Sequence, residues 1–280
     1  MDQSYKEKAT QAAEKKVEPA PIWRAPFRLL VMFAITSFLS SLYAMLAIVG
    51  RMTPTLSNRF TMRWAQLLNR WTGIEVSEHG KNMEEGAILI ANHRSYTDIP
   101  AIMGSVPTTF LAKASVRRWP IIGWAASIAS TIFVDRDCKN SRRKARSDLK
   151  DRLDKGLSVM VFAEGTTTAK GTCIDLRPGM FYTAAQGNLP VVPVAIEYLE
   201  ADDAWVGPET FVPHFLRRFR QKRMKVVVSY GPTLRGNDAE ALKQQTQDWI
   251  RTELNKDPYQ LHAQGNNPLA KEYNHEQQTA

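Results

Sequence analysis

The stretch Ala87–Asp98 reads AILIANHRSYTD, an apolar run followed by a histidine and, five positions later, an aspartate. The run Ala87–Ala91 predicts a buried strand. His93 and Asp98 would lie about 140° apart around a regular helix, so they cannot share one helical face. They can meet only if His93 occupies the turn that leaves the strand and Asp98 lies in the first turn of the next helix.

A carboxylate that binds one ring nitrogen of a histidine leaves the other nitrogen free to act as a general base. An isolated H-x4-D pattern, however, is more often a surface histidine beside an aspartate that caps a helix. The remainder of the sequence has to decide between these two interpretations.

Further blocks follow in order along the chain. They are IFVDR at Ile132–Arg136, FAEGT at Phe162–Thr166 and VPVAI at Val192–Ile196, with Leu111–Lys113 and Trp119–Trp124 between the first block and the second. Together with N-H-x4-D at the end of a predicted strand, these blocks resemble the lysophospholipid acyltransferase family of membrane glycerolipid synthesis. The resemblance covers residues 76 to 235, which is most of the globular part.

The resemblance implies an O-acyltransferase in which His93 takes the proton from the acceptor hydroxyl. Asp98 would fix the ring tautomer and stabilise the imidazolium. The implied donor is acyl carrier protein or coenzyme A carrying a fatty acyl thioester, and the first acceptor is lysophosphatidic acid, which would give phosphatidic acid. No G-x-S-x-G elbow is present, so no covalent acyl-enzyme is expected. We also expect no cofactor and no metal.

The turn Glu164–Thr166 follows a predicted strand. Gly165 allows backbone N–H groups to approach a ligand closely, so we expect Gly165 and Thr166 to form an oxyanion or phosphate cradle. Glu164 would either accept hydrogen bonds from the acceptor headgroup or order the loop. The turn is not a nucleotide P-loop, because Lys170–Gly171 reverses the order that a P-loop requires.

One position departs from the family pattern. The third family block usually reads E-G-T-R, and Thr167 stands where the arginine would bind the acceptor phosphate. Threonine cannot replace the bidentate grip of a guanidinium. Lys113, Arg136 and Arg177 are the cations available instead. Family members with E-G-T-T or E-G-T-S act on other acceptors, so a lyso-ornithine lipid or another lyso-aminolipid remains an alternative acceptor.

The chain has 280 residues, 44% of them apolar, and a net charge of +9. This size and composition allow one domain with appendages. The basic charge indicates an acidic partner, which could be anionic lipid or nucleic acid. A membrane-anchored nucleic-acid binder would leave the histidine and aspartate unexplained and lacks a known binding pattern. We therefore expect membrane lipids as partners and no nucleic acid.

Residues 29–49 carry no charge. As a helix they would be about 31 Å long, which matches a bilayer core of about 30 Å. They predict a membrane helix that either spans the bilayer or bends into one leaflet, with a buried core helix as the alternative. Trp64, Leu67, Leu68 and Trp71 then form one face of an amphipathic helix that would lie in the headgroup layer or dock on the core. We expect the inner membrane, with the catalytic domain facing the cytoplasm.

The expected organisation is a polar tail at 1–25, membrane-associated helices at 26–75, an acyltransferase domain at 76–257 and a disordered tail at 258–280. Apolar strands alternate with helices, which predicts an α/β fold, and the resemblance implies a mixed sheet flanked by helices. Strands are expected at 87–91, 108–113, 131–135, 158–163, 191–198 and 224–230. Helices are expected at 97–105, 119–129, 141–155, 178–187 and 238–255.

The chain also contains two basic clusters. Arg142–Arg146 opens a predicted helix whose later residues alternate in charge, which is typical of a solvated face. His214–Lys225 interleaves aromatic and cationic residues. That second cluster would bind lipid headgroups, the phosphates of coenzyme A or the acidic helix of acyl carrier protein, or would simply be a solvated edge.

Overall fold

The computed structural model describes residues 20–81, 84–119, 123, 126–127 and 131–265. The elements are α2 (Arg24–Ile48), α3 (Pro54–Thr72), β1 (Ile74–His79), β2 (Ile88–Ala91), α4 (Asp98–Met103), β3 (Thr108–Lys113), η1 (Ala114–Arg118), β4 (Ile132–Val134), α6 (Lys139–Asp154), β5 (Ser158–Phe162), α7 (Gly179–Gly187), β6 (Val191–Tyr198), η2 (Ala201–Asp203), α8 (Phe211–Arg218), β7 (Met224–Tyr230), α9 (Ala239–Leu254) and α10 (Pro258–Gly265).

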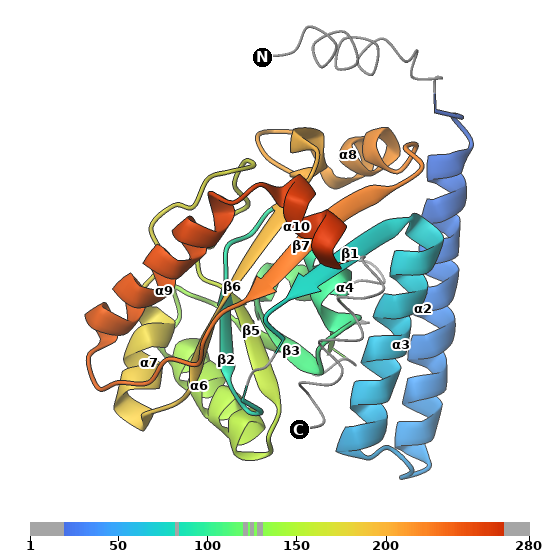
Figure 1. The fold of residues 1–280 in the computed structure, drawn as a ribbon. Coiled ribbons are helices and arrows are strands. Elements are labelled where there is room, and N and C mark those ends of the chain that lie inside the picture. Colours follow the sequence, from blue (N-terminus) through green and yellow to red (C-terminus); the bar gives the residue numbers. More distant parts are fainter. Residues whose placement is uncertain (1–19, 82–83, 120–122, 124–125, 128–130, 266–280) are drawn as a thin grey trace, which may run out of the picture.

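Within the described residues, seven strands form one sheet in the order β1-β7-β6-β2-β5-β3-β4 (Figure 1). Neighbouring strands are parallel except β6 and β7, which are antiparallel. The sheet is therefore mixed, as expected, and the strands β6, β2, β5, β3 and β4 run in one direction. Their carboxyl ends meet at one edge, where open α/β sheets bind their ligands.

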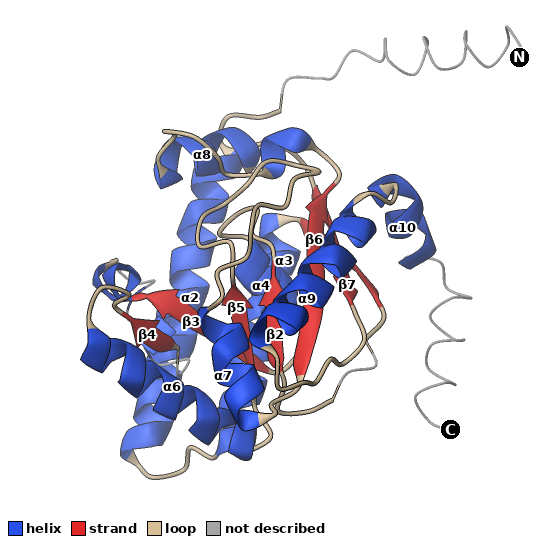
Figure 2. Ribbon diagram, turned by 90° about the vertical axis from the view of Figure 1, so that its left-hand side faces the viewer, coloured by secondary structure: helices blue, strands red, loops and turns tan. Residues whose placement is uncertain are grey.

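Helices cover both faces of this sheet (Figure 2). Ile88 and Ile90 of β2 pack into a core with α6, α7 and α9. Leu89 and Ala91 of the same strand belong to the opposite core, which α2, α3, α4 and α8 complete. A strand that is buried on both faces needs apolar side chains at every position, which explains why β2 lacks polar alternation.

Helices α2 and α3 form an antiparallel pair along one side of the domain (Figure 1). α2 is long and apolar enough to cross a membrane by length and composition, and only 11% of its most apolar window is buried. α3 docks on the domain through the buried residues Ala65 and Leu68, and the Trp64 indole donates to Thr36 Oγ1 at 3.0 Å. Trp71, which was expected on the same face, is half exposed.

The structure corrects several expected boundaries. β1 starts at Ile74, two residues before the expected domain start, and most of its residues are only partly buried, as is typical of a strand at the sheet edge. The tail expected to be disordered from 258 begins instead with α10, where Ser77 Oγ and His262 Nδ1 lie 2.7 Å apart. α8 was not predicted. Most of the helix expected at 119–129 and most of the polar tail at 1–25 lie outside the described residues.

Arg28 of α2 joins three distant segments. Its guanidinium donates to the carbonyl groups of Phe219, Gln221 and Lys222, which lie between α8 and β7. Gly73, which ends α3 with φ +81°, lies against the same guanidinium, and a Cβ there would be 2.6 Å from Arg28 Nη2. The apolar helix is thus attached to the domain by a polar clamp as well as by packing.

Replacing Arg28 with alanine should loosen this clamp. Three carbonyl acceptors would lose a charged donor, and hydrogen bonds of this kind contribute about 1.5–3 kcal/mol each when buried, less when partly exposed as here. We expect faster amide hydrogen exchange in residues 219–222 and faster proteolysis between α8 and β7. Arg51→Ala, at the exposed opposite end of α2, is the matched control. Equal exchange in both variants would show that Arg28 does not hold the segment.

Candidate active site

The sequence blocks converge at the carboxyl edge of the sheet. His93 follows β2, Glu164 follows β5, Arg136 follows β4, and Lys113 ends β3. β2 and β5 are adjacent, and β5 pairs in turn with β3. Residues that are far apart in the chain are therefore brought to one place by strand order alone.

His93 and Asp98 meet as the spacing predicts. His93 lies on the turn after β2, Asp98 is the first residue of α4, and His93 Nδ1 lies 2.7 Å from Asp98 Oδ2. Because a carboxylate can only accept, Nδ1 carries the proton and donates it, and Nε2 keeps a free lone pair. The ring stacks on Phe162, with 4.0 Å between ring centroids, which holds its plane.

Asp98 is fully buried and accepts hydrogen bonds from several sides. Oδ2 also receives the backbone N–H groups of Arg94 and Ser95 at 2.7 and 3.1 Å, and Oδ1 receives the Tyr198 hydroxyl at 2.7 Å. Burial, followed by the nearby Asp98 charge, raises the pKa of Tyr198 well above its ordinary value, so the phenol stays protonated. A buried carboxylate needs such donors to remain charged.

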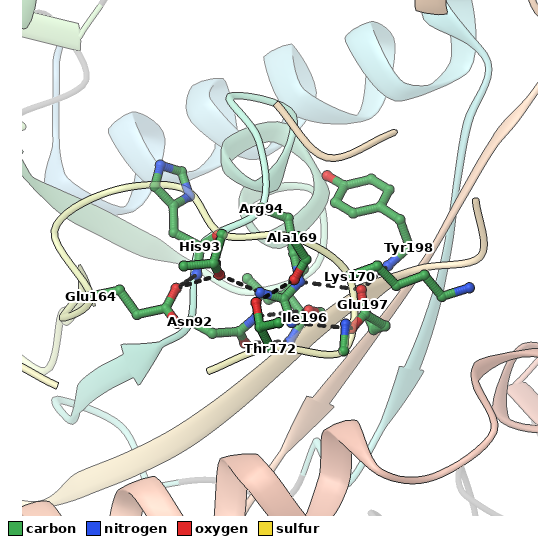
Figure 3. A network of polar contacts seen from close by, with 12 residues as sticks. Asn92, His93, Arg94, Glu164, Ala169, Lys170, Thr172, Ile196, Glu197 and Tyr198 are labelled. Atoms are coloured by element: carbon green, nitrogen blue, oxygen red, sulfur yellow. Dashed lines mark hydrogen bonds and ion pairs between the residues drawn. The ribbon is translucent and has the colours of Figure 1, made fainter. Parts of the chain in front are cut away.

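A second polar network, which includes Arg94, Glu164 and Glu197, lies next to the His93 turn (Figure 3). Arg94 is completely buried. Its Nε and Nη2 donate to the two carboxylate oxygens of Glu197 of β6, at 3.2 and 3.1 Å. Its third nitrogen donates to Thr168 Oγ1, and Glu197 also accepts the backbone N–H of Gly171 at 2.7 Å. The pair therefore ties β6 to the loop that carries the E-G-T block.

Glu164 orders that loop, which was one of the two roles expected for it. It is 2% exposed, and its oxygens accept the backbone N–H groups of His93 at 2.7 Å and Ile174 at 3.0 Å and the hydroxyl of Thr168 at 3.0 Å. Burial raises the pKa of this carboxyl, and the N–H donors oppose the rise. These three hydrogen bonds give Glu164 the loop-ordering role, and its contact with a headgroup stays a prediction.

Gly165 lies between two arginine side chains. Its φ is +76°, and a Cβ there would be 2.5 Å from Arg177 Nε and 2.8 Å from Arg136 Nη1. Within the described residues, neither guanidinium has a carboxylate partner. Burial, and then the Arg177 charge, lowers the pKa of Arg136, which remains a cation at neutral pH. Two unpaired guanidiniums at one glycine form a site suited to an anion.

The other predicted residues have distinct places. Lys113 is exposed and lines a cavity, whereas Arg136 and Arg177 do not contribute to its lining. Thr166 is exposed on the turn. The hydroxyl of Thr167 donates to the backbone carbonyl of Trp205, so this side chain secures the loop and does not take the place of the missing arginine.

The cavity extends from His93 towards the helix pair. Its volume is about 460 Å³, and its lining is almost entirely apolar. The wall includes Leu39 and Tyr43 of α2, Trp64 of α3, Phe110 of β3 and Phe211 of α8. The general-base candidate thus lies where an apolar chamber meets the polar edge of the sheet. Among the described residues, no group of three or more histidine, cysteine or acidic side chains is arranged to hold a metal.

Three contributors were not identified from the sequence. Asn92 pairs its side-chain amide with the backbone of Ile196, at 2.9 and 2.8 Å, and so fastens β2 to β6. Arg94 and Glu197 form the buried ion pair described above. A charge inside the otherwise apolar stretch Val191–Tyr198 was the available sign that Glu197 needs a buried partner.

Comparisons with known proteins agree with this geometry. The sequence profile of the family described as Acyltransferase matches residues 70–197. The chain is 32% identical over 206 residues to the lyso-ornithine lipid O-acyltransferase of Pseudomonas aeruginosa. The match covers 71% of this chain and 80% of that protein. It is 27% identical over 128 residues to the 1-acyl-sn-glycerol-3-phosphate acyltransferase of Neisseria meningitidis, over 46% of this chain and 50% of that protein.

The crystal structure of the 1-acyl-sn-glycerophosphate (LPA) acyltransferase from Thermotoga maritima has a similar fold. It matches with a TM-score of 0.58 and 19% sequence identity, and the match covers 82% of this chain and 96% of that chain. The family profile begins at the end of α3 and ends in β6, so it contains the histidine, the aspartate and the glycine turn. The chain therefore belongs to the lysophospholipid acyltransferase family and is an acyltransferase.

Proposed function

We propose that this acyltransferase moves a fatty acyl group from the thioester of acyl carrier protein or coenzyme A to the free hydroxyl of a lyso-lipid, with His93 as the general base. The observation that carries the proposal is the His93–Asp98 pair, whose free Nε2 lies at the edge of an apolar chamber. The chamber offers a place for an acyl chain, and the polar edge of the sheet offers a place for a headgroup.

In the proposed reaction, His93 Nε2 takes the proton of the acceptor hydroxyl as its oxygen attacks the thioester carbonyl carbon. Asp98 stabilises the imidazolium through Nδ1. The tetrahedral intermediate collapses, the carbon–sulfur bond breaks, and the thiolate takes the proton from the imidazolium. An ester and a free thiol leave, and His93 returns to its starting state.

The oxyanion of that intermediate needs donors that are already in place. In the described part of the chain, the backbone N–H groups of Thr166 and Thr167 have no protein acceptor. They follow Gly165, and Glu164 holds this turn against the His93 backbone. We assign the oxyanion site to this turn.

For the acceptor we favour a lyso-ornithine lipid. The relative with four fifths of its length matched is named for that substrate. Thr167 stands at the position where the family usually has a phosphate-binding arginine, and its hydroxyl is already bonded to Trp205. The carboxylate of an ornithine headgroup would bind between Arg136 and Arg177, because guanidinium groups match carboxylate geometry.

Lysophosphatidic acid is the second candidate. Arg136 and Arg177 provide two positive charges at one glycine, and a phosphate monoester carries up to two negative charges. Their positions differ from that of the usual arginine, but their charge is sufficient for this headgroup. The product would then be phosphatidic acid.

The apolar helix α2 and the lipid-modifying relatives support association with a membrane. α2 exposes large apolar side chains along its length, among them Leu30, Phe38 and Met45. We propose the inner membrane, with the catalytic domain facing the cytoplasm, where soluble acyl thioesters are available. The support for this location is the apolar helix together with the lipid-modifying relatives.

The function is tested by giving purified protein in detergent a labelled acyl thioester and a panel of lyso-lipids. We expect transfer to lyso-ornithine lipid, and His93→Ala should lower kcat about 10²–10⁴-fold because a positioned base contributes that much. The variant should still fold, because Asp98 keeps the backbone N–H groups of Arg94 and Ser95 and the Tyr198 hydroxyl as donors when the imidazole is removed.

His79→Ala, a histidine on β1 outside the site, is the matched control and should retain activity. Transfer only to lysophosphatidic acid would replace the favoured acceptor with the second one. Transfer to neither acceptor, or activity that persists in His93→Ala, would contradict the proposed function.

The anion site is tested by Arg136→Gln and Arg177→Gln. Each variant removes one guanidinium, and charged hydrogen bonds contribute about 1.5–3 kcal/mol, so KM for the acceptor should rise about tenfold to hundredfold. kcat should change much less, because neither side chain takes part in proton transfer. Arg235→Gln removes an exposed arginine that pairs with Glu84 and serves as the control. An unchanged acceptor KM in both variants would exclude the two arginines from headgroup binding.

A further inference from the structure

A group of exposed cations borders the active site at the β4 edge of the sheet. We call it the basic surface, and it consists of Arg117, Arg118, Lys139, Arg142, Arg143 and Arg146. Arg117 lies over the Phe133 ring of β4, 5.8 Å from its centroid, and Arg142 donates to the backbone carbonyl of Arg136. The cations of η1 and of the first half of α6 thus lie on either side of β4.

Within the described residues, none of these six cations has an ion-pair partner. The second half of α6 is different, because Lys150 pairs with Asp154 and Lys155 pairs with Asp151. Asp135 and Asp137 are exposed carboxylates next to the basic surface. The solvated face expected from the sequence is thus balanced in charge only in its second half.

The position of these cations on α6 is electrostatically unfavourable. Lys139, Arg142 and Arg143 occupy the amino-terminal turns, where the helix dipole is positive and acidic residues are preferred. No acidic residue lies in the first turn, and Cys138 provides no side-chain cap. Basic residues at the amino terminus of a helix that no acidic residue of the same turn offsets are typical of a functional surface. An anionic partner would supply the missing compensation.

The η1 part of the basic surface lies next to the apolar cavity beside His93. Ser115 and Val116 of η1 line the apolar cavity, whereas the neighbouring Arg117 and Arg118 point to solvent. α6 packs on the face of the sheet opposite α2 and α3 (Figure 2). A bilayer against the outer side of α2 would therefore be separated from α6 by the whole sheet.

We propose that the basic surface docks the acidic carrier protein that delivers the acyl thioester. This inference rests on the proposed function and names the source of its donor. The α6 part of the basic surface lies on the face of the sheet away from α2, where a soluble partner fits better than a membrane. A free nucleotide thioester fits less well, because none of the six cations lines the cavity beside His93 and nucleotides bind in concave pockets. Complementary charge on a broad exposed surface is typical of steered protein docking.

The test measures steady-state kinetics with acyl carrier protein and acyl-CoA as donors for the full chain in detergent. The variant is Arg143→Glu combined with Arg146→Glu, and the control is Lys150→Glu combined with Lys155→Glu, which reverses two charges in the paired half of the same helix. We expect the first variant to raise KM for acyl carrier protein about tenfold or more at low salt, because steering of this kind changes association 10–10³-fold. Its kcat, its KM for acyl-CoA and the kinetics of the control should change less than twofold.

Salt provides a second readout. KM of the unaltered chain for acyl carrier protein should rise with ionic strength, and that rise should be weaker in the variant. Equal losses with both donors would assign the surface to nucleotide phosphates and overturn the proposal. Loss of binding to anionic vesicles without a change in carrier KM would assign it to lipid instead. A chain that transfers from acyl-CoA but never from the carrier would also overturn it, whereas no transfer from any thioester would refute the proposed function itself.

Discussion

The site depends on keeping one carboxylate charged where water does not reach it. Asp98 is fully buried, and a charge in such a place is stable only if donors replace the water. The turn after β2 supplies backbone N–H groups, β6 supplies the Tyr198 hydroxyl, and His93 supplies its ring N–H. Satisfying Asp98 therefore fixes the turn, the orientation of the base and the distance between β2, β6 and α4. The geometry of the His93–Asp98 pair and the local fold therefore depend on the same hydrogen bonds.

The polar residues near Asp98 fix the loop after β5 in the same way, through hydrogen bonds to buried charges. Glu164 reaches the His93 backbone, and Arg94 connects Glu197 with Thr168. A buried ion pair of this kind adds little to net stability, but losing one partner typically costs about 3–5 kcal/mol. Its main effect here is positional, because the glycine turn and the base are both attached to it. Neither can shift without disturbing the other.

Much of the fold could be predicted because burial leaves a clear pattern. β3, β6 and β7 have the expected boundaries, and the histidine turn and α4 follow from the Ala87–Asp98 stretch. β1 and α10 were missed because they lie at the sheet edge and bury few apolar side chains. α8 was missed because its aromatic and cationic residues were assigned to a binding surface. A mixed pattern of this kind does not distinguish a docked helix from an exposed edge.

The site was predicted less completely, for a different physical reason. The histidine and aspartate are five residues apart, so backbone geometry alone restricts how they can meet. Arg94 and Glu197 are 103 residues apart, and their contact follows from strand order, which spacing along the chain does not reveal. The role of Glu164 was left between two alternatives because a carboxylate at a strand end has the same sequence pattern whether it faces inward or outward.

The helix pair has one further consequence for handling this protein. α2 and α3 supply one side of the apolar chamber beside His93, so the apolar segment is part of the wall of the candidate site. Trimming it to obtain a water-soluble fragment would leave His93 in place but open the compartment beside it to bulk solvent. A detergent belt or a nanodisc that preserves both helices is therefore the appropriate preparation, even for studies of the chemistry alone.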